Sequence, residues 1–176
     1  LVTYGVQRHY PALLDAPNAH PLIHLAATNF ILMHNDTDQI HLQRESYKKK
    51  GAYFGKVIKR VCVDGATWSP VQPVSAKRQG SVVVLKFHVP RGPLVLDTIN
   101  VRINTDYGFS LVDSGGSAIT ISSVQLLGDD RVKITAATAI PAGAFVRYAW
   151  VQNTDVPAWG FVAGPINGPR GNLRDS

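Results

Sequence analysis

Hydrophobic and polar positions follow two different patterns along this chain of 176 residues, and the change falls near residue 64. From Gln43 to Cys62 apolar residues recur at spacings of seven, four and three, which predicts an amphipathic helix. Most of its lysines fall on one face, and the apolar face would consist of Tyr47, Phe54, Ile58 and Val61. Upstream, the short apolar run at 22–27 suits a buried strand.

Short runs typical of β-strands follow residue 75, at 82–89, 94–103, 118–127, 132–137 and 145–152. Turn signals such as Ser114 to Ser117 and Gly128 to Asp130 separate them, and no helical pattern lies between them. This spacing predicts an antiparallel β-sandwich. Pro70 and Pro73 predict an irregular linker before it, and the Gly/Pro-rich tail from Pro165 is expected to be irregular.

The coarse prediction is therefore an α/β remnant followed by an antiparallel β-sandwich. The expected domain division is residues 1–64 for the first part, 65–76 for the linker and 77–176 for the sandwich. Because the chain begins with Leu1 and its only methionine is Met33, we expect it to be part of a longer gene product.

Composition narrows the class of protein. Hydrophobic residues make up 45% and charged residues 17%, which excludes a disordered chain. No apolar run is long enough to span a membrane. The one cysteine, Cys62, excludes an internal disulfide and a zinc–thiolate site, and its place on the helical apolar face predicts a buried packing residue.

Lys and Arg, 18 in all, outnumber 12 Asp and Glu, so the formal net charge is +6. The lysines gather on the predicted helix, where a charge run is more often the solvated face, and no nucleic-acid motif accompanies them. We therefore expect no nucleic-acid or membrane partner, whereas the charge could steer the protein toward acidic polysaccharide. Trp68 and Trp159, beside prolines, are candidates for exposed sugar contacts, and Trp150 is expected in the core.

The string Asp38-Gln-Ile-His41 carries the candidate chemistry. In an Asp-x-x-His turn the carboxylate can accept a hydrogen bond from one imidazole nitrogen, which leaves the other nitrogen as a general base. The helix that follows would place its positive end near the imidazole and favour the neutral, proton-accepting form. The alternative interpretation is a loop in which Asp38 caps the helix and His41 is merely exposed.

With its flanking elements, this string resembles the last conserved block of the SGNH (GDSL-type) hydrolases, in particular their carbohydrate O-acetylesterases. That block is an Asp-x-x-His loop before a glycine-containing final helix, matched over residues 20–62 by Asp38, His41, Tyr47, Gly51 and Gly55. Ser46 stands where a glycine is more usual. The family's Gly-Asp-Ser nucleophile block and its oxyanion-hole glycine and asparagine are not recognisable in this sequence.

The resemblance implies the end of a flavodoxin-like SGNH domain: its last strand, its Asp-x-x-His loop and its final helix. It also implies that the chain is the C-terminal portion of a serine esterase that removes O-acetyl groups from a polysaccharide or glycan. His41 would be the base and Asp38 its orienting acid, while the serine would lie in an upstream segment of the same gene product. No metal or organic cofactor is needed.

The downstream β region resembles accessory domains of such esterases in phage tails and in secreted or periplasmic bacterial proteins, including sialate and xylan acetylesterases. That context favours a homo-oligomer. The alternative function is a non-catalytic β-sandwich module for glycan binding or virion assembly.

Two other motifs have simple explanations. Pro21, between His20 and His24, argues against the helix that would align both histidines on a metal. Ser46 and Lys49 match a Ser-x-x-Lys nucleophile motif by chance, because no companion motif accompanies them.

Overall fold

The computed structural model of the chain describes residues 2–3, 15–27, 32–33, 41–99, 103–149 and 171–176. Within these ranges the chain is mostly β-sheet, with one long helical segment. That segment consists of α2 (Arg44–Ile58) and the π-helix η1 (Lys59–Val63), which continues it. A single helical turn lies at 15–19. No described helix has the length and apolar character that crossing a membrane requires.

The strands of the described ranges form two four-stranded sheets and one two-stranded sheet. The first has the order β2-β3-β8-β7, from strands Gln72–Gln79, Val82–His88, Arg131–Ala136 and Ile121–Leu126. The second has the order β1-β9-β5-β6, from strands Val2–Thr3, Phe145–Tyr148, Phe109–Val112 and Ala118–Ile119. The two-stranded sheet joins β10 to β4, which are Leu173–Asp175 and Leu94–Leu96. The pairings are antiparallel except for the parallel contact of β1 with β9.

The core lies between the two larger sheets, because alternate residues of their strands point inward. β3 buries Val83, Leu85 and Phe87, and β8 buries Val132, Ile134 and Ala136. From the facing sheet, β5 and β9 add Phe109, Leu111, Val146 and Tyr148 to the same cluster. A period of two along a strand places these side chains on one face, so the sheets pack as a sandwich.

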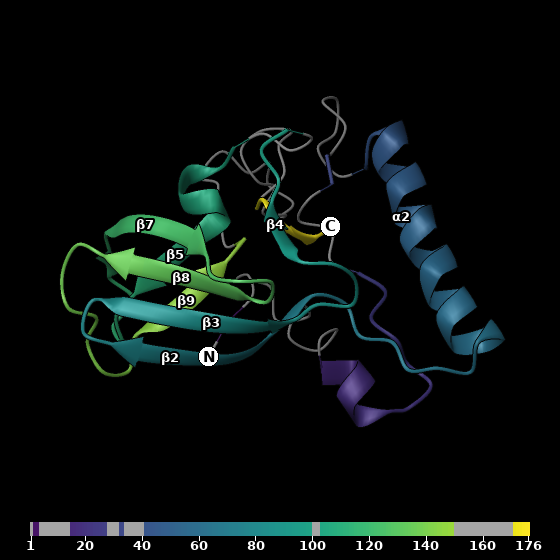
Figure 1. Cartoon of the computed structure of the whole chain (residues 1–176), viewed down its shortest axis with the longest axis horizontal. Coiled ribbons are helices and arrows are strands. Elements are labelled where there is room, and N and C mark those ends of the chain that lie inside the picture. Colours follow the sequence, from purple (N-terminus) through teal and green to yellow (C-terminus); the bar gives the residue numbers. More distant parts are fainter. Residues whose placement is uncertain (1, 4–14, 28–31, 34–40, 100–102, 150–170) are drawn as a thin grey trace.

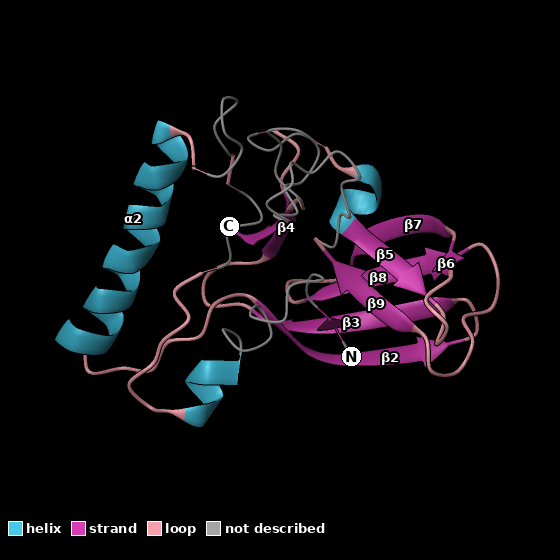
Figure 2. Ribbon diagram, turned by 180° about the vertical axis from the view of Figure 1, so that it is seen from behind, coloured by secondary structure: helices cyan, strands magenta, loops and turns pink. Residues whose placement is uncertain are grey.

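α2 stands on one side of the sandwich, with β4 and the C-terminus between it and the sheets (Figures 1 and 2). The turn η2 (Thr105–Gly108) leads into β5 and holds Asp106 and Tyr107 at positive φ. The molecule therefore has two regions: a closed sandwich and a helix beside it.

The fold class expected from the sequence is wrong, because it began with an α/β remnant of a flavodoxin-like domain. Residues 22–27 form no strand, and Leu22 is 81% exposed. A strand needs a neighbour for its backbone N–H and C=O groups, and no described strand lies beside this run. The described sheets are essentially antiparallel rather than built from parallel βα units.

Some of the predicted local elements are confirmed and others differ in the structure. The helix and the hairpin turn at Ser114 to Ser117 are confirmed; in the turn, Asp113 Oδ1 accepts hydrogen bonds from the backbone N–H of Gly115 and Ser117 at 2.9 and 2.8 Å. The strand expected over 94–103 shrinks to β4, and Ile99 is 93% exposed. Pro73 lies inside β2, where an edge strand with a register shift tolerates its missing N–H.

Candidate functional site

The loop that carries the Asp-x-x-His motif is anchored at both ends. The Gln43 N–H donates to the Met33 carbonyl at 3.0 Å, and the Met33 N–H donates to Ser46 Oγ at 2.9 Å. Leu32 and Leu42 are buried beside these contacts. These contacts hold residues 32–33 and 42–43 side by side, and residues 34–40 between them lie outside the described residues.

His41 follows this loop directly and precedes α2 by two residues. Its side chain is exposed, so it is accessible to a second molecule. Asp38 lies outside the described residues, and the pairing of the two side chains stays a prediction.

Ser46, at the position where the resemblance would favour glycine, has a structural role. It is 5% exposed, and its hydroxyl accepts the Met33 hydrogen bond. A buried hydroxyl that closes a loop in this way is not presented to a substrate. Lys49, the other half of the Ser-x-x-Lys match, is exposed, which agrees with a chance match.

The helix turns a different face inward from the one that its periodicity suggested. Ser46 and Val57 are its buried residues and Tyr53 is half-buried. Tyr47, Phe54 and Ile58, expected on a core-facing side, are 48%, 48% and 58% exposed. At 100° per residue these three side chains lie about a third of a turn away from Tyr53. The apolar stripe of α2 therefore faces away from the rest of the described chain.

A cleft lies between the C-terminal half of this helical segment and the sandwich. Its larger part encloses about 470 Å³ between Lys56, Lys59 and Arg60 on one side and His88 and Arg91 on the other. A smaller part adjoins it at the residues that line both, which are Trp68, Pro90 and Asp175. We call the two parts together the Trp68 cleft.

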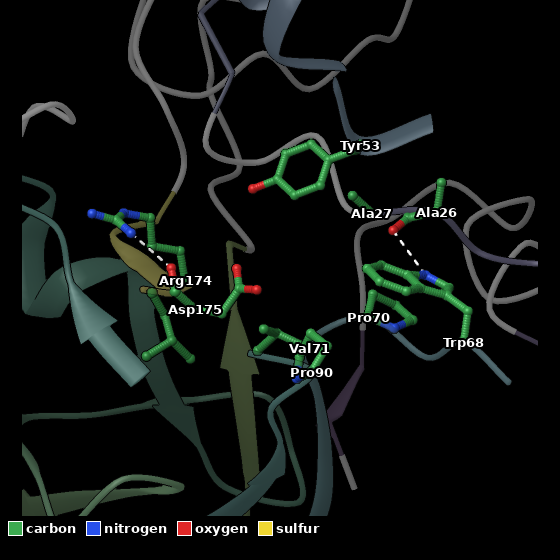
Figure 3. Close-up of a pocket in the computed structure, with 10 residues that line it drawn as sticks. Ala26, Ala27, Tyr53, Trp68, Pro70, Val71, Pro90, Arg174 and Asp175 are labelled. Atoms are coloured by element: carbon green, nitrogen blue, oxygen red, sulfur yellow. Dashed lines mark hydrogen bonds between the residues drawn. The ribbon is translucent and has the colours of Figure 1, made fainter. Parts of the chain in front are cut away.

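Hydrogen bonds from the indole nitrogen hold the Trp68 side chain in place. The indole N–H donates to the carbonyls of Leu25 and Ala26, at 3.1 and 3.2 Å. Figure 3 shows the bond to Ala26. The ring is thus fixed by a segment far away in sequence, with part of its surface accessible. Trp68 was expected to be exposed, and it is half-buried with one side toward the cleft.

Tyr53 and Asp175 reach into the smaller part of the cleft from different sides (Figure 3). Burial raises the pKa of the Tyr53 phenol, the negative charge of Asp175 raises it further, and Arg174 acts in the opposite direction. Tyr53 is therefore a neutral hydrogen-bond donor at physiological pH, and Lys56 Nζ lies 5.3 Å from the centre of its ring.

The C-terminal strand β10 brings Arg174 and Asp175 to the cleft, although the Gly/Pro-rich tail was expected to be irregular. The fully buried Asn172 fixes it: its amide donates to the Asp97 carbonyl at 2.7 Å, and its carbonyl oxygen accepts from the Asn104 N–H at 3.0 Å. Arg174 Nε pairs with the buried Asp97 carboxylate at 2.7 Å. The only sequence signal was the short Leu-Arg-Asp run after Asn172, which has no recognisable period.

Gly171 allows this strand to lie close to β9. A Cβ atom at this position would overlap the hydroxyl of Tyr148, which accepts a hydrogen bond from the Leu173 N–H at 2.7 Å. Only a residue without a side chain fits there.

Other candidate chemistry finds no support in the described part of the chain. No group of three or more His, Cys, Asp or Glu side chains there could hold a metal ion, and His20 and His24 lie in a turn and a loop. Cys62, predicted to be buried, is exposed near the end of η1, because the face that carries it is uncovered. Trp150 and Trp159 lie outside the described residues.

The chain has a distant structural similarity to a known protein. No protein-family model and no curated protein sequence matches the chain. A solved structure described as a novel carbohydrate acetylesterase from Xanthomonas citri matches 77% of the chain, with 22% identity and a TM-score of 0.49. The chain spans 26% of that esterase's length. The similarity is one of fold alone, to a part of that protein.

Proposed function

We propose that this chain supplies the acid and the base of a serine carbohydrate esterase, Asp38 and His41, to a serine carried by another segment of the same gene product. The substrate is an acetylated polysaccharide or glycan. The observation that carries the proposal is the position of His41: it is exposed, and only Leu42 and Gln43 separate it from the start of α2.

The exposed stripe of α2 supports a contribution from a second polypeptide segment. Tyr47, Phe54 and Ile58 form a row of apolar side chains on the helix that begins beside His41. Burial of such side chains is favourable by roughly 25 cal/mol per Å² of apolar area. A segment that covers the stripe and carries the serine and an oxyanion hole would complete the site next to His41.

The chemistry follows the serine–histidine–acid scheme. The serine oxygen attacks the acetyl carbonyl while His41 takes the serine proton, and Asp38 stabilises the imidazolium. His41 then gives the proton to the departing sugar hydroxyl. In the second half, His41 takes a proton from water, whose oxygen attacks the acetyl-serine, and acetate leaves as the serine is reprotonated.

The test is acetate release from acetylated polysaccharide by the complete protein, expressed with its serine-containing segment. We expect His41→Ala to lower kcat by roughly 10⁶-fold and Asp38→Ala by roughly 10⁴-fold, because the acid of such a triad acts through the histidine. His24→Ala, which removes an exposed loop histidine, is the matched control and should retain full turnover. Wild-type turnover by the His41→Ala protein would refute the assignment.

A second candidate function, a non-catalytic β-sandwich module for glycan binding or virion assembly, is favoured by the sandwich itself. The buried residues of its core, which extend in sequence from Val83 to Leu173, pack against one another within the described part of the chain. This candidate predicts no acetate release from any combination of the chain with the rest of its gene product. The same hydrolysis experiment therefore separates the two functions.

A further inference from the structure

The Trp68 cleft brings cationic side chains, a fixed aromatic ring and hydrogen-bond acceptors together in one open groove. We propose that it binds an acidic oligosaccharide, a sugar chain whose residues carry carboxylate groups. His41 is not among the described residues that line the cleft, and the proposal stands whether or not the chain takes part in ester hydrolysis.

Positive charge reaches the cleft from both of its walls. Lys56 and Arg60 come from the helical segment, and Arg91 comes from the turn between β3 and β4. Among the described residues these three side chains pair with no carboxylate, whereas Lys59 binds both oxygens of Asp64 at 2.8 Å. Cations on opposite walls can therefore hold successive carboxylates of one bound chain.

The remaining groups favour a sugar over other anions. A sugar ring presents an apolar face, which fits against a fixed indole, and several hydroxyl groups, which donate hydrogen bonds. Asp175 and the hydroxyl of Ser69 line the cleft and can accept them. The phosphodiester groups of a nucleic acid carry no such hydroxyl donors for Asp175 and Ser69 to bind.

The size of the cleft suits an oligosaccharide segment. Its larger part, about 470 Å³, falls within the range of small-ligand sites, roughly 300–1,000 Å³. The smaller part continues from it past Trp68 to Tyr53, whose neutral phenol is a further donor for a sugar carboxylate or ring oxygen. The smaller part, about 30 Å³, is too small for a sugar ring, so a sugar bound in the larger part can extend only a substituent such as its carboxylate toward Tyr53.

The first test is calorimetric binding of oligogalacturonate to the purified chain, with a neutral malto-oligosaccharide and a single-stranded DNA oligonucleotide as comparisons. We expect oligogalacturonate to bind most tightly and its affinity to fall as salt is raised. The double variant Lys56→Gln/Arg91→Gln, which removes one cation from each wall, should bind about tenfold more weakly.

The control variant Lys48→Gln/Lys77→Gln removes the same net charge from exposed positions that do not line the cleft. It should stay within about twofold of the wild-type affinity. An equal loss in both double variants would show that net charge alone attracts the ligand and would overturn the proposal. Tighter binding of DNA, or no binding of oligogalacturonate, would also overturn it.

The second test concerns the ring. Trp68→Phe keeps an aromatic face and should bind oligogalacturonate within a few-fold of the wild type, whereas Trp68→Ala should lose about tenfold or more. Because Trp68 also holds Leu25 and Ala26, circular dichroism must show that both variants are folded. Unchanged affinity in a folded Trp68→Ala protein would refute the role of the ring. Neither test measures hydrolysis, so a failed esterase assignment leaves its result intact.

Discussion

The helix α2 and the sandwich use apolar residues in opposite ways. In β3 and β8 every second residue is apolar and buried, from Val83 to Phe87 and from Val132 to Ala136. In α2 the apolar residues have equally regular spacing, yet Tyr47, Phe54 and Ile58 are about half exposed. The two sheets of the sandwich cover each other's apolar residues. The described residues do not cover the apolar stripe of α2 in the same way.

This difference shows that periodicity identifies a face but not what covers it. The alternating strands have partners within the chain: β2 pairs with β3 and β7 pairs with β8 across short turns, and β3 pairs with β8 although they lie far apart in sequence. The helical stripe would need a second layer of structure, and the described residues provide none on that side. Under the function proposed above, the serine-containing segment would dock onto this stripe.

The largest effect expected from this comparison is on stability. Leu85→Ala should lower the free energy of unfolding of the chain by about 2–5 kcal/mol, because Leu85 is 1% exposed in the core. Phe54→Ala, a larger truncation on the stripe, should change it by less than about 0.5 kcal/mol. Urea unfolding followed by circular dichroism measures both.

The contrast would break down if both variants lost similar stability. That result would mean that the stripe is already packed in solution, for instance against a second copy of the chain. Size-exclusion chromatography at the same protein concentration would then show a dimer that Phe54→Ala weakens.

A smaller effect is expected at the glycines of the helix. Nothing lies within 4 Å of a Cβ atom built on Gly51, so Gly51→Ala should stabilise the isolated chain by about 0.5–1 kcal/mol. If a segment docks closely on this side, the same substitution should lower acetate release by the complete protein. Thermal unfolding and the hydrolysis assay measure the two effects.

Gly80→Ala is the control for this substitution. Gly80 also has open space around it, but its φ of +57° is strained for alanine, so this variant should lose stability. A gain at Gly80, or no gain at Gly51, would contradict the backbone argument.

The smallest effect concerns Asp106 in η2, before the sandwich strand β5. Burial raises the pKa of this carboxyl above 3.8, so the folded state disfavours its ionised form. Stability then falls as pH rises from 3.8 through the raised pKa, and the loss persists at neutral pH. Asp106→Asn, which also suits the φ of 49°, should gain roughly 0.5 kcal/mol or less at pH 7.

This gain should shrink once the pH is below 3.8, where Asp106 is protonated in both states. Urea unfolding of both proteins at neutral and acidic pH measures the difference. A gain that is the same at every pH would assign the effect to backbone conformation rather than to the charge.

The sequence predicted local elements better than their surroundings. The α2 helix, β3, β7 and β8 follow from periodicity, and the turn at Asp113 follows from its Ser-Gly-Gly-Ser run. The strand expected at 22–27 and the buried Cys62 were wrong, because both predictions assumed a covering layer. β10 was missed because three residues are too few to show a period; buried hydrogen bonds from Asn172 hold it.

The sequence likewise predicts one part of the candidate functional sites, the Asp38–His41 motif, and not the other, the Trp68 cleft. The order of residues alone places His41 beside a helix start and Asp38 three residues earlier, since these are neighbours along the chain. The Trp68 cleft was not predictable, because it unites residues from 26 to 175 through contacts between distant segments. Periodicity and turn chemistry are short-range properties that the sequence determines by itself. Which apolar face is covered, and which charges share one space, was decided by tertiary packing, because burial depends on neighbours that lie far away in sequence.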